Sequence, residues 1–196
     1  MIYGMVGMGA LIVAYWIDEA YTYDDGVWLV AASMAPGLIL GVGSGFAVPM
    51  TSLPEMVGAY NGFGGLAAAF EGLGLYLDPT NTLLMRFGDV QAQQTKSMLW
   101  VQAIALWLSI VIGMMTFTGS FVAVGKLNGM IASKPRVVPY RGIFTILIFA
   151  AMIVFGALAF SGDPGWNDRG PGLYYLLVVT FLAGVEGIVA VMAIGG

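Results

Sequence analysis

The sequence predicts an all-α integral membrane protein, a bundle of about six transmembrane helices. Hydrophobic residues make up 59% of the 196 residues and charged residues only 9%, a balance that excludes an ordinary soluble domain. The apolar residues fall into six runs separated by short polar segments. Because about 20 mainly apolar residues, at roughly 1.5 Å each, cross the hydrocarbon core of a bilayer, each run is a candidate span. We expect residues 1–196 to form a single transmembrane domain without a soluble nucleotide-binding domain.

The predicted helices cover residues 2–17, 27–48, 54–77, 97–125, 143–160 and 172–194. The first run has no basic segment before it and no cleavage site after it, so we interpret it as a spanning helix and not as a signal peptide. The next two runs contain glycines at every fourth position, Gly37, Gly41 and Gly45 in one and Gly58 and Gly62 in the other. Such stripes let helix backbones approach closely in lipid, so we interpret both as packing surfaces. Short polar loops bound the last three runs.

Charge divides the loops into two kinds. The loop after the fourth predicted helix contains Lys126, Lys134, Arg136 and Arg141 and no acid. Most acids occupy the loops after the first, third and fifth helices: Asp18, Glu19, Asp24, Asp25, Asp78, Asp89, Asp163 and Asp168. Lysine and arginine mark the cytoplasmic or matrix side of a membrane. We therefore place the Lys126–Arg141 loop and both termini on that side.

The chain contains neither cysteine nor histidine. A disulfide framework and a cysteine metal site are therefore excluded, and the commonest proton carrier and metal ligand is missing. No glycine-rich nucleotide fingerprint follows a strand. We expect no catalytic residue, no metal and no cofactor bound by this chain alone.

Polar side chains inside the apolar runs carry the functional information, because an unpaired polar group in lipid costs several kcal/mol. Asn61, in the third run, either holds water or forms a hydrogen bond to a neighbouring helix. Ser120, in the fourth, has the alternative of bonding to the carbonyl one turn earlier. Glu71 and Glu186 are the acids deep in apolar runs. Both are weaker candidates for a proton relay, and Glu71 has the alternative of reaching the headgroups.

Four strings connect these residues to a known family: IYGMVGMGALIVA (2–14), MTSLPEMVGAYNGFGGLAAAF (50–70), TFTGSFVAVGKLNGMIASKPRVVP (116–139) and AIGG (193–196). The chain resembles the membrane domain of the proton-translocating NAD(P) transhydrogenases, in the part carried by the beta subunit in bacteria. Asn61 stands at the position of a polar residue, histidine or asparagine, in the third helix. Ser120 is the serine of the TFTGS-like string. Glu71 and Glu186 stand where the family leads us to expect apolar or small residues.

The resemblance implies a helix bundle that conducts protons while two soluble domains transfer hydride between NAD(H) and NADP(H). NAD and NADP would bind in partner domains. The partners would be the lipid bilayer and other transhydrogenase subunits, with no nucleic acid, in a bacterial inner, mitochondrial inner or plastid membrane. Family members continue after IGG into an ADMPVV-like motif, further helices and an NADP-binding domain.

Two functions follow as alternatives. The first is the proton-path portion of a transhydrogenase, with Asn61 and Ser120 holding water and another chain supplying the proton carrier. The second is a degenerate, transhydrogenase-like accessory subunit of a larger respiratory or photosynthetic membrane complex, which the absence of histidine favours. A secondary transporter is a weak third alternative, because neither an inverted repeat nor paired broken helices are visible.

Overall fold

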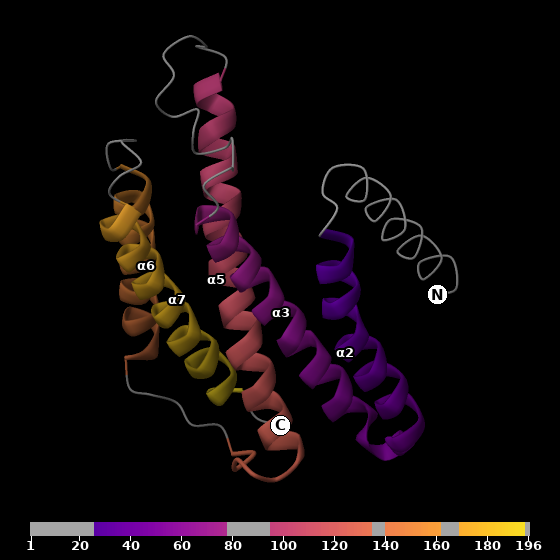
Figure 1. The fold of residues 1–196 in the computed structure, drawn as a ribbon. Coiled ribbons are helices and arrows are strands. Elements are labelled where there is room, and N and C mark those ends of the chain that lie inside the picture. Colours follow the sequence, from indigo (N-terminus) through magenta and orange to yellow (C-terminus); the bar gives the residue numbers. More distant parts are fainter. Residues whose placement is uncertain (1–25, 78–94, 135–139, 162–168, 195–196) are drawn as a thin grey trace. The chain divides into compact units, whose positions relative to one another are not determined.

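The computed structural model describes residues 26–77, 95–134, 140–161 and 169–194, and in these residues every regular element is helical (Figure 1). The all-α class is thereby confirmed for the described residues. The elements are α2 (Gly26–Ala47), the short 3₁₀ helix η1 (Met50–Ser52), α3 (Leu53–Leu77), α5 (Thr95–Leu127), α6 (Arg141–Ser161) and α7 (Arg169–Met192). The chain divides into two compact units, with the division after Met50.

Three of the described helices are long and apolar enough to cross a membrane, over Ala103–Leu127, Arg141–Phe160 and Gly172–Met192. Helix α2 has 22 residues, and its described side chains include the apolar stretch Met34–Ala47. Helix α3 has 25 residues, but its glycines and its polar residues Asn61 and Glu71 lower its mean hydropathy. The predicted span 2–17 lies outside the described residues. A count of six spans therefore remains a prediction.

Helix α2 belongs to the first unit and is described by itself. It continues through Pro36, whose ring removes one backbone N–H from the helix. The Ser44 hydroxyl donates back to the Leu40 carbonyl at 2.6 Å, which satisfies this polar group within the helix. A Cβ atom at Gly37, Gly41 or Gly45 would meet nothing within 4 Å among the described residues. The stripe therefore makes no close helix contact within the described residues.

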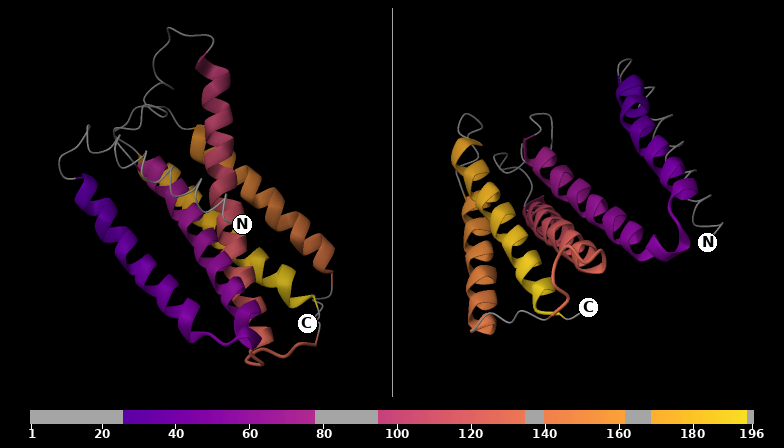
Figure 2. Two further views of the ribbon diagram at one scale, coloured as in Figure 1. Left: turned by 90° about the vertical axis from the view of Figure 1, so that its right-hand side faces the viewer. Right: turned by 90° about the horizontal axis from the view of Figure 1, so that it is seen from below.

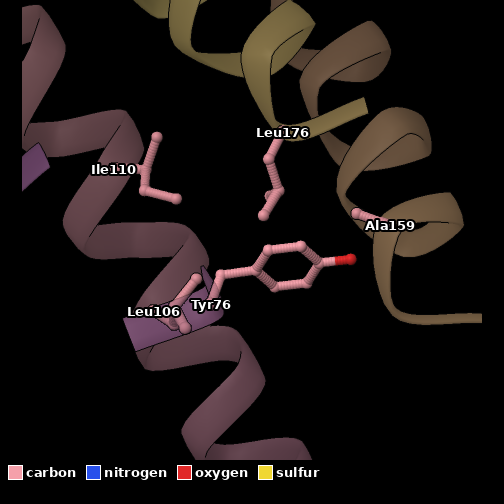
Figure 3. Close-up of a cluster of buried hydrophobic side chains, with 5 residues drawn as sticks. All are labelled: Tyr76, Leu106, Ile110, Ala159 and Leu176. Carbon is pink, nitrogen blue, oxygen red and sulfur yellow. The ribbon is translucent and has the colours of Figure 1, made fainter. Parts of the chain in front are cut away.

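The second unit is a row of four helices in the spatial order α3, α5, α7, α6 (Figure 2). Two apolar clusters hold the row together. The first consists of Tyr76, Leu106, Ile110, Ala159 and Leu176. In Figure 3 the Tyr76 ring extends from α3 toward Ala159 on α6, with Leu176 beside it. The second cluster consists of Val111, Ile148, Met152, Val179 and Ala183.

Glycine allows the central helices to touch backbone to backbone. A Cβ atom on Gly113 of α5 would lie 2.5 Å from the Gly65 carbonyl oxygen of α3. A Cβ atom on Gly187 of α7 would lie 2.5 Å from the Met115 carbonyl oxygen of α5. Gly58 and Gly62 also face α5, against Val124 and Phe121 respectively. Side chains larger than hydrogen would separate these helices.

One predicted boundary is wrong in a way that bears on the site. Lys126 was expected in the loop after the fourth helix, but α5 continues to Leu127 and places Lys126 in its last turn. Arg141 is likewise the first residue of α6. Lysine is compatible with a helix, so α5 includes Lys126 and ends at Leu127, two residues before Gly129, whose φ of 71° directs the chain away from the helix.

Candidate functional site: polar contacts between membrane helices

Asn61 and Ser120 join α3 to α5. The Asn61 Nδ2 atom donates a hydrogen bond to Ser120 Oγ at 2.9 Å. The contact is possible because Gly58 and Gly62, on either side of Asn61, allow α5 to come close. Thr118, two residues before Ser120 in α5, does bond back to its own helix: its hydroxyl donates to the Met114 carbonyl at 3.1 Å.

This polar pair lies at the edge of the α3–α5 interface. Asn61 is exposed on the surface of the second unit, and Ser120 is half-buried. Aromatic rings flank the pair, with Phe63 and Phe121 packed edge to face at a centroid distance of 5.4 Å. An amide has two N–H donors and a carbonyl oxygen that accepts, so one bond to Ser120 leaves most of the capacity of Asn61 facing outward.

Glu186 forms a second polar contact, between α7 and α6. Its side chain is only 2% exposed. Thr145 Oγ1 of α6 donates to Glu186 Oε1 at 2.9 Å. The other oxygen, Oε2, is buried and has no hydrogen-bond partner among the described residues.

Two cations hold the carboxyl end of α7. Lys126, 6% exposed, donates from Nζ to the carbonyls of Val191 at 2.8 Å, Met192 at 3.3 Å and Ile194. Arg141 Nη2 donates to the Ala190 carbonyl at 3.4 Å. The last carbonyls of a helix lack partners within it, and the helix dipole favours cations there. Lys126 and Arg141, which form the basic end of the bundle, therefore cap the C-terminus of α7.

Glu71 lies apart from the polar contacts of Asn61 and Glu186. It is exposed on α3, ten residues from Asn61, which is about 15 Å along a helix.

Two charged residues were not among the candidates from the sequence. Lys126 caps α7, and Glu55 has a buried Oε2 atom without a hydrogen-bond partner among the described residues. The position of Lys126 at the end of an apolar run was the available signal for the first. Among the described residues no cluster of acids suits a metal ion.

The apolar helices and their polar cross-contacts define an integral membrane helix bundle. A family model, NAD(P) transhydrogenase beta subunit, matches residues 1–196, and the chain belongs to this family. Two sequences of NAD(P) transhydrogenase subunit beta from Rhodospirillum rubrum are each 32% identical over 141 residues, which is 70% of this chain. The chain spans 27% of the length of these relatives. No solved structure matches it.

Proposed function

We propose that this chain forms part of the membrane proton path of a proton-translocating NAD(P) transhydrogenase. Hydride transfer between NADH and NADP⁺ would take place in other domains or subunits, which would also bind both nucleotides. The observation that carries the proposal is the Asn61–Ser120 hydrogen bond, which links two adjacent helices at the position of a glycine-lined close approach. Membership of the beta subunit family supports it.

Asn61 and Ser120 act by holding water. Neither an amide nor a serine hydroxyl changes charge at physiological pH, so neither is the proton carrier. With one N–H bonded to Ser120, Asn61 keeps a second donor and its carbonyl oxygen for water on its exposed side. Because residues 1–196 contain no histidine, the carrier next to this pair would be a protonatable side chain from elsewhere in the complex.

The exposed side of Asn61 also defines the partner. A polar amide cannot face hydrocarbon without a cost of several kcal/mol, so a helix of another transhydrogenase subunit covers it. The complex would lie in a bacterial inner membrane or an organellar membrane, with the basic end of the bundle on the cytoplasmic or matrix side. Proton passage would be coupled to hydride transfer because the two states of the complex bind the nucleotides with different affinity.

The test is Asn61→Leu in the complete complex, assayed for proton-coupled transhydrogenation and for assembly. Leucine has a similar volume but no hydrogen-bonding groups, so assembly should persist while coupled activity falls. Ser109→Ala is the matched control. Ser109 also joins α5 to α3, by donating to the Ala68 carbonyl at 2.9 Å, but it lies outside the proposed path. Equal coupled activity in the wild type and Asn61→Leu would contradict the proposal.

The alternative function, an accessory subunit of a larger respiratory or photosynthetic membrane complex, is favoured by the lack of histidine in residues 1–196. It makes the opposite prediction for the same experiment. Asn61→Leu and Ser109→Ala would then affect only assembly, and to the same extent. Mass spectrometry of the intact complex would identify its partners, and partner chains without NAD- or NADP-binding domains would support this alternative.

A further inference from the structure

The position of Glu186 is fixed by the register of α6 against α7. The two helices run antiparallel, side by side (Figure 1). Arg141 lies against Ala190, and Thr145, four residues further along α6, lies against Glu186, four residues earlier in α7. The same register continues to Met152 and Val179 in the apolar core. Glu186 is therefore held about one turn inside the basic end of the bundle, in a segment apolar enough to cross a membrane.

No cation neutralises this carboxyl group among the described residues. Helix α5 presents Lys126 at this end and α6 presents Arg141, but both donate to backbone carbonyls of α7. On the side of α7 that faces α5, Gly187 packs directly against the backbone at Met115, which leaves no space there for a charged side chain. In the part of the chain that the structure describes, the side chain of Glu186 accepts one hydrogen bond, from Thr145 Oγ1, which is an uncharged donor.

We propose that Glu186 is a proton-binding site, with the proton on Oε2. An ionised carboxylate that is 2% exposed and unpaired would bear a large desolvation cost, which a bound proton removes. Since Thr145 donates to Oε1, that oxygen is the acceptor, and the unpartnered Oε2 is the atom that takes the proton. On release, the O–H bond breaks, the electron pair stays on Oε2, and the proton passes to water at the basic end.

This site goes beyond the proposed path through Asn61 and Ser120. It is formed by α6 and α7, whereas that pair joins α3 and α5. It therefore offers the complex a second place to hold a proton, near the end of the bundle that Lys126 and Arg141 occupy. A proton is bound here whether or not Asn61 takes part in transport.

The test is infrared difference spectroscopy of the complete complex in lipid nanodiscs during a pH titration. We expect the C=O stretching band of a protonated carboxylic acid, sensitive to deuterium exchange, that disappears as pH rises. Glu186→Gln should remove the band completely. Glu71→Gln, at an exposed acid of the same type, should leave it, and so should Asn61→Leu.

Thr145→Val gives an assignment that does not depend on replacing the acid. Removing the donor to Oε1 should shift the same band to higher frequency, because the C=O group loses its hydrogen bond. The proposal is overturned if the wild type has no such band, or if the band is unchanged in both Glu186→Gln and Thr145→Val. A band that responds to sodium concentration and not to pH would also overturn it, by identifying a cation site. None of these outcomes depends on coupled transhydrogenation.

Discussion

Replacing Gly113 with alanine should separate α3 from α5 and break the Asn61–Ser120 contact. The new methyl group would lie 2.5 Å from the Gly65 carbonyl oxygen and 2.7 Å from the Ala69 nitrogen, whereas ordinary contact begins at 3.4 Å. Both obstacles are backbone atoms, so no side chain can rotate away. The helices must therefore part by the difference between 3.4 and 2.5 Å, about 0.9 Å.

The same separation acts on the polar pair two turns away. If α5 moves as a rigid body, the 2.9 Å distance from Asn61 Nδ2 to Ser120 Oγ grows to about 3.8 Å, beyond the range of about 2.7–3.2 Å for such a bond. Overpacking of a close interface costs about 1–3 kcal/mol. We expect Gly113→Ala to lower the free energy of unfolding by that amount relative to its control.

Gly64→Ala is the control, because a Cβ atom at Gly64 would meet nothing within 4 Å. It carries the same gain in helix propensity, about 1 kcal/mol, without the collision. The assay is equilibrium unfolding in mixed micelles, followed by circular dichroism. Equal free energies of unfolding for Gly113→Ala and Gly64→Ala would refute the backbone contact between α3 and α5 and the reasoning built on it.

Two further substitutions test the packing of α7. Lys126→Met keeps the length of the side chain but removes the donor to the last carbonyls of α7, so it should cost about 1.5–3 kcal/mol and speed amide hydrogen exchange at Ile194; unchanged exchange would contradict the cap. Gly187→Ala should destabilise the α5–α7 contact, since its Cβ atom would lie 2.5 Å from the Met115 carbonyl, while Gly184→Ala, with its nearest atom at 3.4 Å, should be tolerated. Similar unfolding curves for the two glycine variants would argue against this contact.

Helix positions could be predicted from the sequence because long apolar runs end at polar segments. The predicted span 143–160 compares with Arg141–Ser161 in the structure, and 54–77 with Leu53–Leu77. The first agreement follows from the requirement that a membrane segment satisfy its backbone internally and keep charges outside the hydrocarbon.

Partners of the polar groups could not be predicted in the same way. The sequence indicated that Asn61 and Glu186 each need a partner, and it did not identify Thr145 as the donor to Glu186. That pairing depends on the register of α6 against α7, which is set by side-chain packing between segments far apart in the sequence. Lys126 was expected at a loop for the same reason: only the docking of α7 places carbonyl groups around its amine.

The backbone contact between Gly65 and Gly113 also closes the α3–α5 interface to water at this point. Gly65 is one turn beyond Asn61 in α3, and there the two helices leave no room for a water molecule between them. A file of water that reaches the polar pair cannot continue between α3 and α5. Under the proposed function, water at the polar pair would therefore have to continue along the exposed side of Asn61.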